Sequence, residues 1–76
     1  MGMYLYEAMI EVLRTGRNIP MTIEDITESI INQGLYWKKN GLPPDAWDVG
    51  ARAVSDIQKS SVPMFDVLVK LRDKPL

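Results

Sequence analysis

The chain has 76 residues, of which 46% are hydrophobic and 25% charged, the proportions of one ordinary globular domain. It contains no cysteine and no histidine. These absences exclude a disulfide framework and argue against a zinc site or a nucleophile activated by histidine. The formal net charge is −1, whereas a small domain that binds nucleic acid mainly through charge is usually basic. We expect a single non-enzymatic domain over residues 1–76, with residues 1–3 and 72–76 frayed and with no cofactor or metal.

Targeting signals are not evident in the sequence. No apolar run approaches the ~20 residues of a membrane span, and residues 1–7 lack the basic segment of a secretory signal. Together with the absence of cysteine, this predicts a cytoplasmic domain without a membrane partner.

The first helix is predicted over residues 4–14. Gly16 is expected to end it as a left-handed residue, and residues 19–21 are expected to be extended and to form a short edge strand. Helical spacing produces one apolar stripe, which consists of Leu5, Met9, Val12 and Leu13.

The second helix is predicted over residues 23–33. Thr22 followed by Asp25 has the spacing of a capping box, and Gly34 follows the last helical residue. The apolar residues Ile23, Ile26 and Ile30 recur at helical spacing and are expected to face the core.

The connection after the second helix is the most basic and aromatic part of the chain, with Tyr36, Trp37, Lys38 and Lys39 before an Asn-Gly turn. The lysines could hold phosphates beside an aromatic ring. Alternatively, the rings could complete a small core while the lysines stay in water. We assign Tyr36 to the core, and both interpretations stay open for the other three residues.

The third helix is predicted from Pro43-Pro44-Asp45 to about Lys59, because proline suits the first turn and an acidic cap suits the helix dipole. Its two sides differ in character. One side carries Trp47, Gly50, Ala51, Val54 and Ile57, and the other, which is expected to face outward, carries Asp48, Arg52, Ser55 and Lys59, with Asp56 at its edge.

The polar side of this helix allows two interpretations. Arg52, Ser55 and Lys59 could enter a DNA major groove, with Arg52 reading guanine. Alternatively, this side is an ordinary solvated surface on which Asp48 pairs with Arg52 and Asp56 pairs with Lys59, each pair contributing only ~0.2–0.5 kcal/mol. The acidic residues favour the second interpretation.

Residues 64–71 are rich in β-branched side chains and partly alternate, which predicts a strand. In that strand Phe65, Val67, Val69 and Leu71 would point to the same side. The strand could pair with residues 19–21, which we favour, or with a second copy of the chain.

Several short motifs resemble those of a known family. They are Tyr6-Glu7-Ala8 to Val12-Leu13, Ile19-Pro20-Met21-Thr22-Ile23-Glu24-Asp25-Ile26, Ile31-x-x-Gly34-Leu35-Tyr36, Pro43-Pro44, Val54-x-x-Ile57 and Phe65-Asp66-Val67. The chain resembles the HARE-HTH winged helices and is similar to the N-terminal domain of Mrr-type restriction enzymes. The resemblance implies an α+β winged helix-turn-helix with three helices and a short strand. Because residues 65–71 lack a glycine or asparagine turn, the wing is expected to be reduced.

The same resemblance implies a DNA-binding or DNA-associated adaptor with a role in transcription regulation. Its expected site residues are Arg52, Ser55, Lys59, Trp37, Lys38 and Lys39. The alternative is a protein–protein interaction module that could dimerise through the C-terminal strand. A continuous basic stripe would favour DNA, whereas acidic residues interleaved with the basic ones would favour a protein partner.

Overall fold

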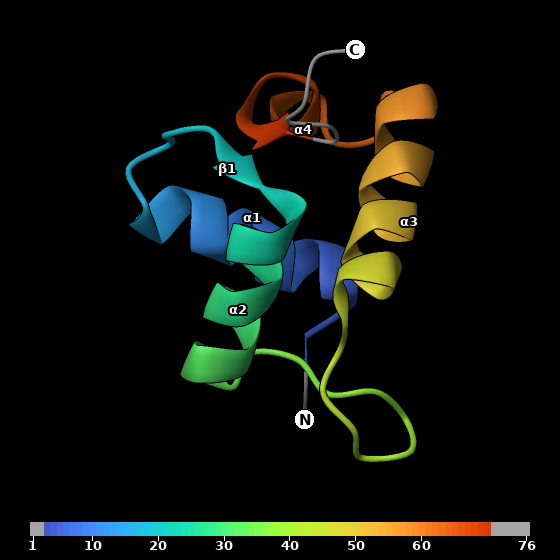
Figure 1. Ribbon diagram of the computed structural model, residues 1–76. Coiled ribbons are helices and arrows are strands. Elements are labelled where there is room, and N and C mark those ends of the chain that lie inside the picture. Colours follow the sequence, from blue (N-terminus) through green and yellow to red (C-terminus); the bar gives the residue numbers. More distant parts are fainter. Residues whose placement is uncertain (1–2, 71–76) are drawn as a thin grey trace, which may run out of the picture.

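Four helices and two short strands make up the described part of the chain. Their order is α1 (Leu5–Thr15), β1 (Met21–Thr22), α2 (Ile23–Gln33), α3 (Ala46–Gln58), α4 (Pro63–Leu68) and β2 (Val69–Lys70). This computed structural model describes residues 3–70 (Figure 1). The expected α+β class is confirmed. The fraying predicted for the two ends falls largely on residues 1–2 and 71–76, which lie outside the described part.

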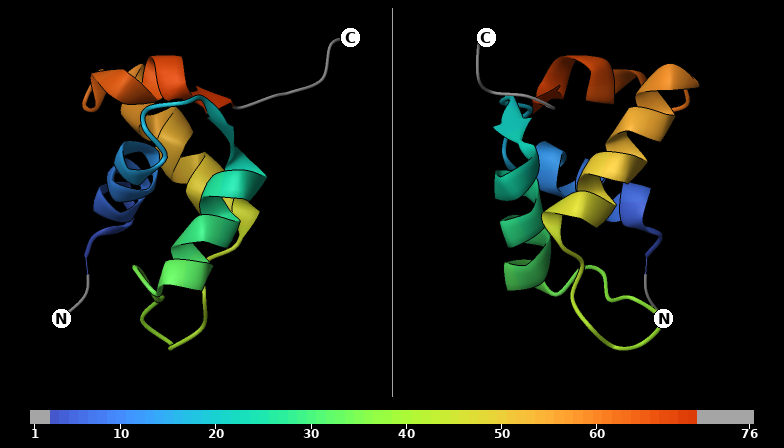
Figure 2. Two further views of the ribbon diagram at one scale, coloured as in Figure 1. Left: turned by 90° about the vertical axis from the view of Figure 1, so that its left-hand side faces the viewer. Right: turned by 45° about the vertical axis from the view of Figure 1, so that its right-hand side comes forward.

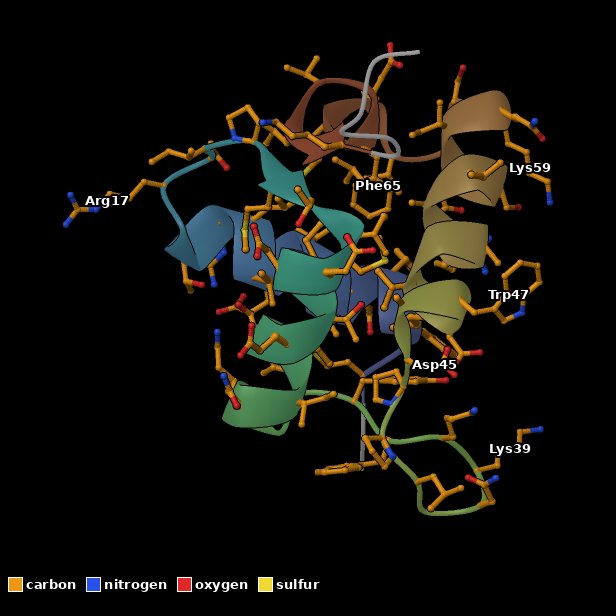
Figure 3. The ribbon with its side chains drawn as sticks, viewed as in Figure 1. Arg17, Lys39, Asp45, Trp47, Lys59 and Phe65 are labelled. Carbon is orange, nitrogen blue, oxygen red and sulfur yellow. The ribbon has the colours of Figure 1, made fainter. Side chains whose placement is uncertain are left out.

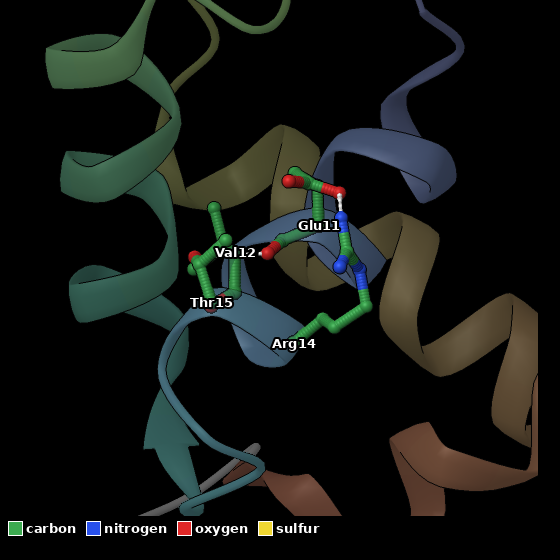
Figure 4. Close-up of polar contacts among 4 residues, drawn as sticks. All are labelled: Glu11, Val12, Arg14 and Thr15. Carbon is green, nitrogen blue, oxygen red and sulfur yellow. Dashed lines mark hydrogen bonds and ion pairs between the residues drawn. The ribbon is translucent and has the colours of Figure 1, made fainter.

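The helix α1 begins after Tyr4, whose backbone N–H donates to the Glu7 carboxylate at 3.0 Å. Its last turn holds an ion pair between Arg14 and Glu11, and the Thr15 hydroxyl donates to the carbonyl groups of Glu11 and Val12 (Figure 4). These local contacts lie on the solvent side of the helix. The opposite side is buried and carries Ala8, Met9, Val12 and Leu13.

The expectation that Gly16 is left-handed was wrong. Its φ is −85°, and the positive φ angles fall on Arg17 (65°) and Asn18 (58°). A Cβ atom at this position would lie 3.2 Å from the Val12 carbonyl oxygen, a tighter contact than most Cβ atoms make, so a larger residue would require a small shift of the backbone. The glycine therefore permits a close backbone approach rather than an unusual dihedral angle.

The helix α2 has the predicted bounds. The Thr22 hydroxyl accepts a hydrogen bond from the backbone N–H of Asp25 at 3.1 Å, as expected of a cap. Gly34 ends the helix with a φ of 64°, the left-handed geometry that glycine adopts without strain. Ile26 and Ile30 are fully buried.

The helix α3 ends at Gln58, close to the predicted end, but it begins at Ala46 after its cap Asp45, so that Pro43 and Pro44 precede the first turn. Its rotation also differs from the expected one. Its buried line is Val49, Ala53 and Asp56. Of the side that carries Trp47, Ile57 packs against the core, whereas Trp47 is 80% and Val54 38% exposed. Figure 3 shows Trp47 projecting from α3 away from the other helices.

The strand predicted over residues 64–71 was wrong for most of its length. Pro63 occupies the first turn of the six-residue helix α4, where proline is favoured. Phe65 and Leu68, three residues apart, are both buried on one side of this helix. Strand alternation would have placed Val67 beside Phe65, yet Phe65 is fully buried and Val67 is 72% exposed. Residue 71 lies outside the described part.

A two-stranded parallel sheet joins the C-terminal end of the described chain to the start of α2. Met21 pairs with Val69, and Thr22 pairs with Lys70. The expected pairing of these two segments within one chain is confirmed in this shorter form. The sheet lies beside α4 at one end of the molecule, whereas the α2–α3 connection lies at the opposite end (Figure 2).

The core lies between α1, α2 and α3 and is covered at one end by α4 and β2. Among residues 3–70, Phe65 is the one fully buried aromatic side chain, and it reaches into the core from α4 (Figure 3), while Tyr6 and Tyr36 pack against the core partly buried. The remaining buried apolar residues are Ala8, Met9, Val12, Leu13, Ile23, Ile26, Ile30, Val49, Ala53, Leu68 and Val69.

We predict that Phe65→Ala lowers the free energy of unfolding by about 3–5 kcal/mol, because it removes a fully buried ring and leaves a cavity. This loss approaches the whole stability of a small domain, so Phe65→Ala could fail to fold. Phe65→Leu is a milder substitution with an expected loss of about 1 kcal/mol, which can be measured. The matched control is Val67→Ala on the exposed side of α4, with a change within about 0.5 kcal/mol. Urea denaturation followed by circular dichroism would measure all three. Equal losses for Phe65→Ala and Val67→Ala would contradict the helical arrangement.

Candidate functional site

Four of the six predicted site residues lie around one open groove of about 730 Å³. Lys38 and Lys39 reach it from the α2–α3 connection, and Arg52 and Ser55 reach it from α3. Trp37 and Lys59 do not line it. The remaining walls come from the start of α1, the connection and α3: Tyr4, Leu5, Tyr6, Tyr36, Asp48 and Ala51.

Lys38 is already engaged within the domain. Its ammonium Nζ lies 3.2 Å from Asp48 Oδ2. The same carboxylate accepts a hydrogen bond from the backbone N–H of Asp45, while the Asp45 carboxylate accepts one from the N–H of Asp48. This is a reciprocal capping box at the start of α3. The hydrogen bond from the Asp45 backbone, with a further contribution from Lys38, lowers the pKa of Asp48 from its ordinary value.

Arg52 is engaged as well, with a different acid from the one predicted. Its guanidinium Nη2 donates to Asp56 Oδ1 at 2.7 Å and makes a longer contact of 3.4 Å with the Ser55 hydroxyl. Asp56 is only 4% exposed, and neither its Oδ2 atom nor Arg52 Nε has a hydrogen-bond partner among the described residues. The predicted pairs, Asp48 with Arg52 and Asp56 with Lys59, are replaced by Lys38 with Asp48 and Arg52 with Asp56.

Acidic residues therefore interrupt the row of basic residues along α3. Asp48 lies with Lys38, and Asp56 lies with Arg52. Within residues 3–70, Lys39 and Lys59 are exposed and form no ion pair. Figure 3 shows them near opposite ends of this side of the molecule, so they do not form one cluster.

The other notable surface on α3 is apolar, and we call it the outer face of α3. It consists of Trp47, Gly50, Ala51 and Val54, at spacings of three, four and seven residues along the helix. Beside it runs a groove of about 620 Å³, which is also lined by Ile23, Ala46, Ser55 and Gln58.

Gly50 lines this groove next to Ile23. A Cβ atom at Gly50 would lie 3.8 Å from Ile23 Cγ2, an ordinary van der Waals distance. The glycine is therefore not required for the packing of α2 against α3. Its missing side chain instead leaves a notch between Trp47 and Val54, into which an apolar side chain could pack.

Other kinds of site are not supported in the described part of the chain. Within residues 3–70, no group of three or more acidic side chains is placed to hold a metal ion. No helix in this range is long and apolar enough to cross a membrane.

Comparisons with models of protein families, with curated proteins and with solved structures found no match. The resemblance to HARE-HTH domains therefore stays a prediction.

We predict that Arg52→Ala lowers the free energy of unfolding by about 2 kcal/mol, because it leaves the buried Asp56 carboxylate without a compensating charge. This is less than the about 3–5 kcal/mol of a fully buried pair, since the Arg52 side chain is 37% exposed. Lys59→Ala is the matched control and is expected to change stability by less than about 0.5 kcal/mol. Thermal and urea unfolding at neutral pH measure both. If Arg52→Ala left the free energy of unfolding unchanged, the ion pair between Arg52 and Asp56 would not be what holds α3 in place.

Proposed function

We propose that the chain is a non-enzymatic protein-interaction domain that binds a protein partner through the outer face of α3. The observation that carries this proposal is the exposure of Trp47, the largest side chain of that face, at 80%. A single exposed hydrophobic residue needs no explanation, whereas a contiguous exposed patch is typical of an interaction surface.

The free energy that would be gained by burying Trp47 supports a role in binding. Tryptophan buries about 150–250 Å² in an interface, and each Å² of buried apolar surface contributes about 25 cal/mol. Covering Trp47 alone would therefore contribute on the order of 4–6 kcal/mol before the costs of association. Tryptophan is also among the residues most enriched at the energetic centres of protein interfaces.

The helix that presents this face is held rigidly. Asp45 and Asp48 fix its first turn through the capping box, and Val49 and Ala53 anchor its opposite side in the core. A partner would therefore meet a preorganised surface, which lowers the entropic cost of binding.

The charge distribution supports a protein partner over a polyanion. Lys38 and Arg52, two of the bases expected to contact DNA, each lie against a carboxylate at 3.2 Å and 2.7 Å. A phosphate approaching either base would also approach its acid, so that attraction and repulsion largely offset.

We predict that a displayed library of 15-residue peptides, selected on this protein with Ala51→Glu as the counter-selection protein, will yield peptides with apolar residues at helical spacing. Ala51 is exposed, so glutamate is tolerated in the helix but places a charge in the middle of the apolar face. Selected peptides should bind the variant at least about tenfold more weakly, a difference of about 1.4 kcal/mol. An Arg17→Ala protein serves as the matched surface control, because Arg17 lies on the far side of the molecule from α3 (Figure 3). Peptides that bind wild type and Ala51→Glu equally would overturn the proposal.

The second candidate is nucleic-acid binding by a winged helix-turn-helix, as the resemblance implies. It is supported by one observation: Lys38, Lys39, Arg52 and Ser55 come together around a single groove. The order of the helices and the short sheet are compatible with that fold. In this candidate Lys39, which forms no ion pair within residues 3–70, makes the first phosphate contact.

We predict that any binding to a labelled random DNA duplex is confined to low salt. With two or three phosphate contacts, the log–log slope of affinity against salt would be about −2 to −3, since each contact contributes about −0.9. Fluorescence anisotropy measures it, and Lys39→Ala should flatten the slope by about one contact. Arg17→Ala is the control, because Arg17 lies on the far side of the molecule (Figure 3). A slope unchanged in Lys39→Ala would contradict the role of this groove.

A further inference from the structure

We infer that the outer face of α3 binds a second copy of this chain, with the two α3 helices antiparallel about a twofold axis near Ala51. This inference rests on the proposed function, because it uses the same face and names its partner. A twofold interface must be complementary to itself, so each side chain has to find its match on the same face.

The shape of the face meets this requirement. Side chains rise along a helix by 1.5 Å per residue, so Trp47 lies about 6 Å before Ala51 and Val54 about 4.5 Å after it. In an antiparallel pair centred on Ala51, Trp47 of one copy therefore meets Val54 of the other at nearly the same height. Successive residues are rotated by 100° around a helix axis, which places Trp47 and Val54 on the same side of the line through Ala51. A twofold axis brings the same side of both helices together, so the two residues can meet.

The middle of the face allows the two helices to approach closely. Ala51 would lie at the crossing point, where a small side chain keeps the helix axes close. Gly50, beside Ile23, lies only about 1.5 Å from Ala51 along the axis, so its missing side chain adds to the space for close approach at the crossing point. Each Trp47 thus meets Val54 of the other copy, and the small residues meet one another at the centre.

The charges favour the antiparallel direction. Asp45 and Asp48 lie at the start of α3, and Lys59 follows its end. In the centred pair, Lys59 of one copy lies within about 3 Å, measured along the helix axis, of Asp45 of the other. Two such contacts arise by symmetry, and the helix dipoles are opposed. A parallel pair would instead place acid beside acid and lysine beside lysine.

The small area of the interface limits the expected affinity of the dimer. One face of a 13-residue helix is smaller than the ~800 Å² that each partner contributes to a standard interface. The dimer should therefore form reversibly and depend on concentration. We expect the average mass to rise from 8.6 kDa towards twice that value between about 10 μM and 1 mM, as mass action requires.

Two measurements test the inference. Sedimentation equilibrium should show association of the wild type, none for Ala51→Glu, which places two carboxylates at the axis, and an about three- to tenfold weaker dimer for Lys59→Glu. Circular dichroism would be the control that each variant is folded. Association that Ala51→Glu leaves intact would overturn the proposed interface.

Single cysteines test the direction, because the natural chain contains none. Under mild oxidation Ala51→Cys should form a disulfide-linked dimer, since its two sulfur atoms lie near the axis. Gln58→Cys should not, because its two copies would be about 21 Å apart along the helices. Faster cross-linking of Gln58→Cys would overturn the antiparallel arrangement. A wild type that stays monomeric at about 1 mM would exclude a second copy as the partner, whereas the proposed function would still be decided by the peptide selection.

Discussion

The rotation of α3 about its own axis determines which of its sides faces the core and which is exposed for binding. That rotation is fixed by a buried line of three residues, Val49, Ala53 and Asp56, of which the last is charged. A buried carboxylate is costly unless an opposite charge accompanies it, and Arg52 provides that charge at 2.7 Å. Turning the helix by half a turn would expose Val49 and Ala53 and separate Asp56 from the core side, so the ion pair and the apolar packing select the same orientation.

This orientation assigns opposite roles to the two groups of side chains on α3. Arg52 becomes part of the domain's own structure, and Trp47 and Val54 become surface. The exposed apolar face is then a consequence of how the core is closed, and the small Gly50 and Ala51 between its larger residues give that face a defined shape. A binding surface on a rigid helix with one face anchored loses little entropy on association.

Much of the secondary structure could be predicted because short-range chemistry determines it. Thr22 and Gly34 bound α2 through a side-chain cap and a left-handed dihedral angle, and Asp45 begins α3 through its capping box. These signals act within four residues and do not depend on the rest of the fold. The bounds of α2 were therefore predicted without error.

The rotation of α3 could not be predicted in the same way. Val49 and Ala53 recur at helical spacing, and so do Trp47, Ala51 and Val54. The second set is more hydrophobic, so periodicity favoured it, but the space between α1 and α2 accepts the smaller pair. The one available signal was the i, i+4 spacing of Arg52 and Asp56, a pair that is typical of an exposed helix and equally compatible with a buried acid. Shape, which no single-sequence pattern contains, decided between the two sides.

The helix α4 was missed for a related reason. Val67 and Val69 suggested a strand, since β-branched residues favour one, yet Phe65 and Leu68 are the residues that meet the core. With α1, α2 and α3 leaving one end of the core open, a single helical turn can insert two large side chains at once. A strand of the same length would bury its alternate residues and would place Val67, rather than Leu68, beside Phe65.

Electrostatics connects these features to the functional proposal. The domain uses Lys38 to support the capping box of α3 and Arg52 to neutralise Asp56. Two of the three bases around the groove are therefore committed to holding α3 in place. A DNA-binding surface would need those charges free, and freeing them would weaken the helix that presents them. The apolar face carries no such conflict, because binding through Trp47 and Val54 requires no contact that the fold already uses.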